Sequence, residues 1–366
     1  MTTSQKSIAI VNGTGRQAAS VIRAVQAVGW HVKAQIYEPH PLVIEELEDL
    51  DNVELFQEPL EDNQALIDGL FEGCQYAFIN TFPAYDEVKV GKALADAAKR
   101  HGVQHYVYGS MPDHSIYNAQ WPGLPNWACK FTVENYIREI GLPATFLYAG
   151  IYNNNFTSLP YPLFCMEFKD DDTLQWQAPF DPNTKLPWLD AEADSGPAVL
   201  QLLKEGIAKW KDRRVALVFQ SLTPIEVCQA FERALNRPCR YVHNPTIEIR
   251  VPIPENYRQQ LRGIEELFGK YKAQYFPNPE FQFALDERRD SGVKRNGERP
   301  KVNASSTQGG GDRASSASSH RSRRITSEAR RLWPGFRRME DYARETFPIE
   351  EEANGKTWMK DKSIST

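Results

Sequence analysis

The sequence feature that most constrains the fold is a strand, a glycine turn and a helix encoded between residues 8 and 28. The apolar run Ile8–Val11 is followed directly by the small-residue turn Asn12-Gly-Thr-Gly15. Apolar side chains then recur at helical spacing, at Ala18, Val21, Ile22, Val25 and Val28. Such a turn places backbone N–H groups at a helix N-terminus, where the helix dipole favours a phosphate group. The start of the chain is therefore typical of a dinucleotide-binding fold.

The turn departs from the usual glycine pattern at one position. In the looser G-x-x-G-x-x-G spacing, the three glycine positions are occupied by Asn12, Gly15 and Ala18. Ala18 is acceptable because the third position only requires a small residue. Asn12 is less usual, although asparagine tolerates left-handed backbone angles better than most residues do. Gly13 and Gly15 can adopt the angles of a tight turn and let a phosphate approach closely.

Composition excludes several classes of protein. A formal net charge of -5 argues against general nucleic-acid affinity, which requires a basic face. The cysteines are scattered, with no C-x-x-C pair, so we expect neither a disulfide framework nor a zinc site. No apolar run approaches the ~20 residues of a membrane span, and no N-terminal signal segment is visible. We expect an intracellular protein that binds no metal and no membrane.

Strands and helices alternate over the first part of the chain. The patterns predict strands at 31–36, 53–56, 76–80, 105–108 and 144–148, and helices at 41–50, 63–71, 86–100 and 130–140. This alternation is typical of a parallel sheet with helices on both faces. The predicted class is α/β, with a doubly wound, Rossmann-type dinucleotide-binding domain over residues 1–150.

The rest of the chain divides into three parts. Residues 151–283 predict a smaller α+β domain over the carboxyl edge of the sheet, with strands at 215–219 and 240–243 and helices at 224–235 and 255–268. Residues 284–324 are rich in Arg, Ser and Gly and predict a disordered loop, whose arginines suit a solvated linker or a nuclear-import signal. Residues 325–366 contain apolar side chains that predict a helical segment packed back on the body.

Candidate ligand-binding residues follow the strands at their carboxyl ends, where doubly wound folds bind ligands. Glu38 lies about 20 residues past the turn, where a carboxylate accepts from the ribose hydroxyls of NAD, although it suits an ordinary surface carboxylate equally well. No arginine ends that strand to bind the 2′-phosphate of NADP, but Arg16 could do so from the turn. NAD is therefore favoured, with NADP as the alternative. Asn80–Phe82, Ser110 and Lys130 fall at the same edge.

Several motifs along the chain resemble those of the NmrA-like family. They are Asn12-Gly-Thr-Gly-Arg-Gln17, Ser110-Met-Pro-Asp-His114, Trp127-Ala-Cys-Lys130, Tyr148-Ala-Gly-Ile-Tyr-Asn-Asn-Asn-Phe156, Leu186-Pro-Trp-Leu-Asp190 and Phe347-Pro-Ile-Glu-Glu-Glu-Ala-Asn354. The resemblance covers nearly the whole chain except the Ser/Arg-rich stretch. It implies a fold like that of extended short-chain dehydrogenases, with an NAD(P)-binding domain and a small C-terminal domain.

The resemblance also implies roles for individual residues. The pyrophosphate would be held by Asn12, Gly13, Thr14, Gly15, Arg16 and Gln17. Tyr37 and Glu38 would flank the adenosine, and Asn80, Thr81 and Phe82 would line the dinucleotide. Lys130 would meet the nicotinamide ribose. The nicotinamide end would be closed over by Asn153, Asn154, Asn155 and Phe156.

The catalytic set of the active dehydrogenases is incomplete in this chain. Those enzymes place a tyrosine four residues before the lysine, which lowers the tyrosine pKa so that the phenolate can move a proton. Here that position is Asn126, whose amide does not titrate, so no catalytic residue is predicted. Ser110 and Lys130 can still bind a cofactor. Isoflavone-reductase-like relatives, however, work with a lysine and without that tyrosine, so an NAD(P)H-dependent reductase using Lys130 is the alternative.

The family resemblance implies a regulator. It implies a negative transcriptional regulator of nitrogen metabolite repression that binds the zinc-finger region of a GATA-type activator, in the nucleus and cytoplasm. An acidic body suits a basic zinc finger electrostatically. We expect no direct nucleic-acid binding, and a monomer, since nothing in the sequence indicates an obligate dimer. A scaffold with a vestigial nucleotide site is the third hypothesis.

Overall fold

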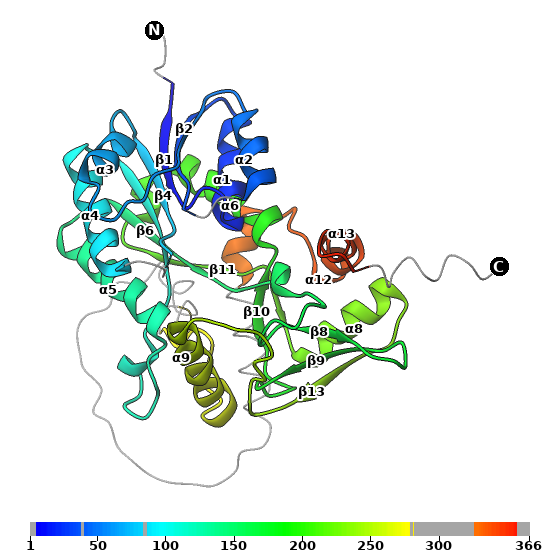
Figure 1. Cartoon of the computed structure of the whole chain (residues 1–366). Helices are drawn as coiled ribbons and strands as arrows, with labels where there is room; N and C mark the ends of the chain where they lie inside the picture. Colours follow the sequence, from blue (N-terminus) through cyan, green and yellow to red (C-terminus); the bar gives the residue numbers. More distant parts are fainter. Residues whose placement is uncertain (1–4, 38–39, 83–85, 279–280, 282–325, 357–366) are drawn as a thin grey trace, which may run out of the picture.

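The computed structural model describes residues 5–37, 40–82, 86–278, 281 and 326–356 of the chain. The predictions for Glu38 and for the disordered loop at 284–324 lie outside these residues. Figure 1 shows a larger lobe that contains the N-terminus and a smaller lobe beside it. Among the described residues, no helix is both long and apolar enough to cross a membrane.

A seven-stranded sheet forms the larger lobe, in the order β11-β6-β5-β4-β1-β2-β3. Its strands are β1 (Ser7–Val11), β2 (His31–Gln35), β3 (Val53–Phe56), β4 (Tyr76–Ile79), β5 (His105–Ser110), β6 (Ala144–Ala149) and β11 (Arg214–Leu217). Every neighbouring pair is parallel. Because β1 lies between β2 and β4, the strand order reverses at β1, where ligands bind in this class of fold. The α/β, doubly wound, Rossmann-type class is confirmed.

Helices cover both faces of this sheet. One face packs against α3 (Gln64–Phe71), α4 (Glu87–Arg100) and α5 (Pro125–Glu139). The other packs against α1 (Arg16–Gln26), α2 (Pro41–Glu48), α6 (Ala191–Glu205) and α7 (Ile207–Trp210). Helix α5 begins five residues before the predicted residue 130, with Pro125 in its first turn, where proline is tolerated. Asn126 and Lys130 therefore lie one helical turn apart.

The strand predicted at 215–219 is in the large sheet, not in the small domain. It is β11, and it pairs in parallel with β6, Val215 opposite Leu147. The crossover between β6 and β11 includes α6, a 15-residue helix that the sequence analysis did not predict. The chain leaves the sheet after β6 to build part of the small lobe, and this excursion interrupts the alternation that reveals the earlier strands.

The smaller lobe contains two three-stranded sheets. One contains β7 (Ile151–Tyr152), β10 (Leu186–Leu189) and β12 (Gln220–Leu222), and the other contains β8 (Met166–Phe168), β9 (Leu174–Ala178) and β13 (Cys239–His243). Its helical elements are η1 (His114–Ile116), η2 (Asn153–Asn155), α8 (Pro224–Leu235), α9 (Glu255–Ile264) and the π-helical turn η3 (Glu265–Lys270). Buried aromatic rings fill its core: Phe156, for example, stacks on Trp188 with centroids 5.5 Å apart.

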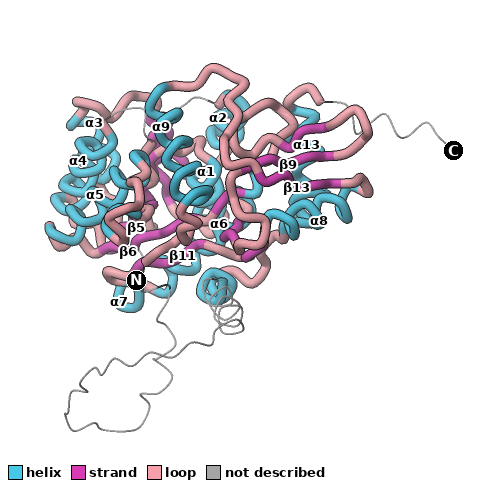
Figure 2. Tube along the Cα trace, turned by 90° about the horizontal axis from the view of Figure 1, so that it is seen from below, coloured by secondary structure: helices cyan, strands magenta, loops and turns pink. Residues whose placement is uncertain are grey.

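The C-terminal segment, residues 326–356, packs on both lobes (Figure 2). It contains a helix over 326–332, α12 (Met339–Asp341), the π-helical turn η4 (Tyr342–Thr346) and α13 (Phe347–Ala353). Ala329 and Leu332 belong to the core beneath the large sheet. Met339 and Phe347 are fully buried in the core of the small lobe. The segment therefore ties the two lobes together.

Candidate functional site

The glycine turn joins β1 to α1 in a geometry that leaves helix amides available. Asn12 adopts φ 62°, the left-handed conformation anticipated for an asparagine at the first glycine position. The Gly15 amide donates to the Asn12 carbonyl at 2.8 Å, and a Cβ on Gly15 would lie 2.8 Å from Asn12 Nδ2, so a larger residue would require Asn12 to move. The first helical hydrogen bond runs from Ala19 N to Gly15 O. The N–H groups of residues 16–18 thus have no helical acceptor and can bind an anion.

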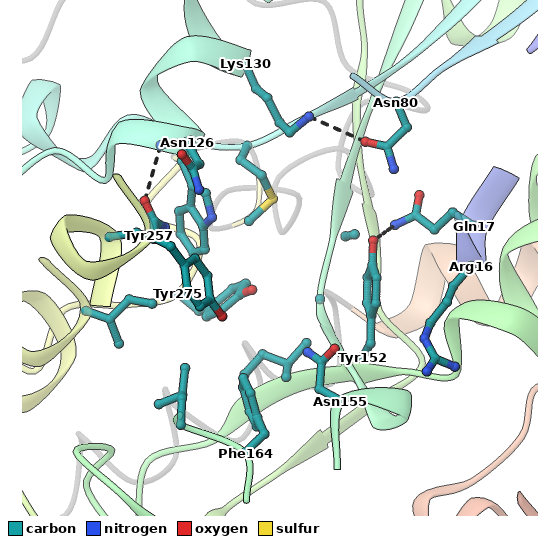
Figure 3. A pocket seen from close by; sticks show the side chains of 18 of the residues that line it. Arg16, Gln17, Asn80, Asn126, Lys130, Tyr152, Asn155, Phe164, Tyr257 and Tyr275 are labelled. Atoms are coloured by element: carbon teal, nitrogen blue, oxygen red, sulfur yellow. Dashed lines mark hydrogen bonds between the residues drawn. The ribbon is translucent and has the colours of Figure 1, made fainter. Parts of the chain in front are cut away.

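A cavity of about 450 Å³ lies at the carboxyl edge of the sheet beside this turn (Figure 3). Its walls come from the glycine turn, the ends of β4 and β6, α5, and α9 with η3. Predicted site residues that line it are Asn12, Gly15, Arg16, Gln17, Asn80, Thr81, Phe82, Lys130 and Asn155. The structure thus brings together residues that are far apart in the sequence, as the strand-end argument predicts.

Some predicted residues lie near the cavity but outside its lining. Gly13 and Thr14 are within the turn itself, and a Cβ on Gly13 would lie 2.9 Å from Ile36 Cδ1. The Tyr37 ring lies 5.0 Å from that of Phe82, so the end of β2 contacts the end of β4. Tyr37 therefore remains close to the cavity wall without forming part of it.

The loop at 153–156 corrects the sequence-based expectation. Of its four residues only Asn155 lines the cavity. Asn154 Oδ1 accepts from the Ala191 amide at 2.9 Å, at the start of α6. Phe156 is 1% exposed and lies in the aromatic core of the small lobe. Asn153 is likewise buried, so Asn153, Asn154 and Phe156 are not part of the cavity lining.

Lys130 reaches from α5 to the end of β4. Its Nζ donates to the Thr81 carbonyl at 2.6 Å and to Glu87 Oε1 at 2.8 Å, with Asn80 Oδ1 at 3.5 Å. Glu87 is only 2% exposed in its side chain and also accepts from the Thr81 hydroxyl at 2.6 Å. A buried carboxylate and a backbone carbonyl therefore fix the ammonium group at the cavity wall.

The tyrosines of the cavity lining are poor proton carriers at neutral pH. Gln17 Nε2 donates to the Tyr152 hydroxyl at 2.5 Å. Burial raises the pKa of Tyr152 to about 12, and it raises the pKa values of Tyr257 and Tyr275 above their ordinary value. These phenols therefore stay protonated near pH 7. Asn126, one turn before Lys130, holds the Gln260 side chain through its backbone amide at 3.2 Å.

Ser110, expected at the same sheet edge as a residue that can bind a cofactor, does not line the cavity. Its hydroxyl donates to Glu134 Oε2 at 2.7 Å, and the Tyr148 hydroxyl donates to the same oxygen at 2.9 Å. Arg138 and Arg214 bind the other oxygen of this buried carboxylate. Ser110 is therefore part of a closed hydrogen-bond network inside the larger lobe.

The wall opposite the glycine turn was missed by the sequence analysis. It is mostly apolar and aromatic and comprises Met111, Trp127, Leu163, Phe164, Phe180, Tyr257, Gln260, Leu261, Ile264, Phe268 and Tyr275. Part of this wall could have been predicted from the sequence, because Tyr257, Leu261 and Ile264 recur at helical spacing on α9 and so share one face of the helix. The loop contributions at 163–164 and 180 have no such pattern.

The Arg16 side chain lies at the rim of the cavity between two carboxylates. It pairs with Glu192 of α6, and its second partner is Glu350 of α13 at 2.9 Å. The Tyr342 hydroxyl donates to the other oxygen of Glu350 at 2.7 Å. The C-terminal segment thus contacts the first residue of α1, directly after the glycine turn. Within the described residues, no group of three or more His, Cys, Asp or Glu side chains is arranged to hold a metal ion.

Comparisons with known proteins agree with this geometry. The nitrogen metabolite repression protein nmrA of Emericella nidulans is 56% identical over 361 residues, which cover 98% of this chain and 100% of that protein. A crystal structure of NmrA, a negative transcriptional regulator, in complex with NADP matches at TM-score 0.85 and 55% identity, covering 98% of this chain and 100% of that one. A complex with NAD matches at TM-score 0.84, 55% identity and the same coverage. The model of the NmrA-like family matches residues 4–343, and this chain belongs to the NmrA-like family.

Proposed function

We propose that this chain is a dinucleotide-binding negative transcriptional regulator of nitrogen metabolite repression that works without hydride-transfer turnover. The observation that carries the proposal is a cavity with an intact phosphate-binding turn in which, among the described residues, no tyrosine is hydrogen-bonded to Lys130. Position 126 is an asparagine, and the cavity tyrosines Tyr152, Tyr257 and Tyr275 all have raised pKa values. The similarity to a negative transcriptional regulator over nearly the whole chain supports it.

The residues around the cavity fit NAD or NADP. The free amides at the start of α1 and the close approach allowed by Gly15 suit a pyrophosphate. Asn80, Thr81 and Lys130 offer hydrogen-bonding groups for a ribose farther along. The bound dinucleotide would supply two phosphate charges and a nicotinamide ring whose charge depends on its redox state. Because the related structures hold NADP in one case and NAD in the other, we propose that both bind here.

The proposed partner is the zinc-finger region of a GATA-type activator. The net charge of -5 favours association with a basic zinc finger. Calorimetric titration with a purified GATA-type zinc-finger fragment, in the presence of NAD, tests this. We expect saturable binding in the micromolar range or tighter, weakened by salt. Absence of binding would contradict the regulator proposal and favour the reductase alternative. Nuclear and cytoplasmic distribution, also proposed, is checked with a fluorescent fusion.

The reductase alternative is tested separately. NADH and NADPH oxidation is followed with a panel of carbonyl and enone compounds, for the unmodified chain and for Lys130→Ala. We expect no sustained turnover, because Asn126 stands where the active dehydrogenases have a tyrosine and no tyrosine of the described cavity lining is hydrogen-bonded to Lys130. Turnover that the Lys130→Ala substitution abolishes would contradict the proposal.

A further inference from the structure

Arg16 connects the candidate phosphate site with the C-terminal segment. It is the first residue of α1, lines the cavity and is 39% exposed in its side chain. Figure 3 shows its side chain next to Gln17 and Tyr152 at the cavity edge. Two carboxylates, Glu192 and Glu350, already bind its guanidinium group. The phosphate of a binding dinucleotide would therefore approach an arginine whose single positive charge already faces two carboxylates of the protein.

Glu350 is held in place for this contact. Its side chain is 20% exposed, and burial raises its pKa above the ordinary value. The Tyr342 hydroxyl and Arg16 are its hydrogen-bond partners, one at each carboxylate oxygen. A half-buried carboxylate is costly without a counter-charge. The ion pair therefore stabilises Glu350 in its half-buried position, and it also neutralises the charge of Arg16.

Glu351, next to Glu350 in the sequence, gives α13 a second contact near the cavity. Glu351 is fully buried, and its Oε1 accepts from the Ser158 amide at 2.8 Å and from the Thr157 hydroxyl at 3.3 Å. These residues directly follow the loop that contains the cavity residue Asn155. Helix α13 therefore contacts both Arg16 at the start of α1 and the loop that follows Asn155, so a change at Arg16 can alter how this helix docks.

We propose that Glu350 sets the dinucleotide affinity by competing with the cofactor's phosphate groups for Arg16. The inference rests on the proposed dinucleotide binding. A phosphate that takes Arg16 removes the counter-charge of Glu350 and loosens α13, and by linkage any loosening of α13 favours the bound dinucleotide. The phosphate is either the pyrophosphate, common to both cofactors, or the 2′-phosphate of NADP. The sequence separation of 334 residues makes this a coupling between the two ends of the chain.

Calorimetric titrations with NAD and NADP test the competition on the full chain, Glu350→Gln and the control Glu345→Gln. Glu345 is an exposed residue of the same segment, and Glu350→Gln keeps an acceptor for Tyr342 while removing the charge. We expect Glu350→Gln to bind about three- to tenfold more tightly and Glu345→Gln to be unchanged. An equal increase in affinity for NAD and NADP would show that Arg16 binds the pyrophosphate. An increase for NADP alone would show that it binds the 2′-phosphate. Unchanged or weaker binding of Glu350→Gln overturns the proposal.

Amide hydrogen exchange of residues 347–356 tests the coupling independently. In the unmodified chain, dinucleotide addition should speed exchange in α13 several-fold, whereas Glu350→Gln, which has no charge to be left unpaired, should respond little. Slower exchange in α13 on cofactor binding would overturn the proposal. A complete lack of binding by the unmodified chain would instead overturn the proposed function, and the inference with it.

Discussion

Lys130 is held by a buried carboxylate, and this contact gives the residue a structural role beside any role in binding. Glu87 has one oxygen in contact with Lys130 and Thr81, while its other oxygen has no partner in the described part of the chain. Without the ammonium group, a nearly inaccessible negative charge would remain. Loss of ligand binding in a Lys130 variant is therefore ambiguous unless stability is measured as well.

We expect Lys130→Met to lower the free energy of unfolding by about 3 kcal/mol, because Glu87 is left as an unpaired buried charge. The double variant Lys130→Met with Glu87→Gln should lose clearly less unfolding free energy, since the negative charge of Glu87 is removed together with its lysine partner. Urea unfolding of both variants and of the unmodified chain measures the difference. Equal losses in the two variants would show that the ion pair is not the source.

Asp194 predicts a pH dependence of stability. It is fully buried and accepts from the Arg337 amide at 2.9 Å, and burial raises its pKa from 3.8 to about 7. The folded state thus binds the proton more tightly, so the contribution is full below about pH 4 and is lost as the pH rises to about 7. Between pH 5 and pH 8, the difference in unfolding free energy between Asp194→Asn and the unmodified chain should therefore shift by up to about 3 kcal/mol in favour of the variant. Denaturant unfolding at both pH values measures this, with the exposed Asp170→Asn expected to show no such gain.

At the scale of secondary-structure elements, the sequence reveals what local patterns encode. The strands of the large sheet up to β6 are predictable because each is a short apolar run that alternates with an amphipathic helix. Helix α6 and the sheet position of β11 are not, because the chain first builds part of the small lobe. The cavity residues on the side of the glycine turn can be predicted because they lie at the carboxyl ends of strands, which meet at one edge of the sheet. The position of the loop at 163–164 and the contact of Arg16 with Glu350 depend on tertiary packing, which no local sequence pattern encodes.

The crossing of α1 and α6 depends on Gly196. A Cβ at this position would lie 2.0 Å from the Ser20 carbonyl oxygen, and the Gly196 amide donates to the Ser20 hydroxyl at 2.9 Å. Gly196→Ala must therefore separate the two helices, and we expect a loss of about 3 kcal/mol in unfolding free energy. The control is Gly69→Ala in α3, where a Cβ meets open space and alanine favours the helix. A neutral Gly196→Ala in urea unfolding would contradict this account.

At the scale of the whole molecule, the C-terminal segment joins two hydrophobic cores. Its helix over 326–332 packs under the large sheet, while Met339, Tyr342 and Phe347 complete the core of the small lobe. Arg337 strengthens the connection by donating to Asp190, a fully buried carboxylate at the start of α6. The C-terminal segment is thus part of both cores, and we expect the two lobes to unfold together.

A chain that ends at residue 336 tests this cooperativity. It keeps the helix at 326–332 but lacks the apolar side chains of α12, η4 and α13, so the small lobe loses core contacts of large residues such as Phe347 with Phe231, whose ring centroids lie 5.1 Å apart. We expect the small lobe to unfold at lower urea concentration than the large sheet, with tryptophan fluorescence from Trp176 and Trp188 changing before the far-ultraviolet circular dichroism. A control chain that ends at residue 356 retains all described C-terminal contacts and should show coincident transitions. Coincident transitions at unchanged midpoint in the shorter chain would mean that the segment does not couple the lobes.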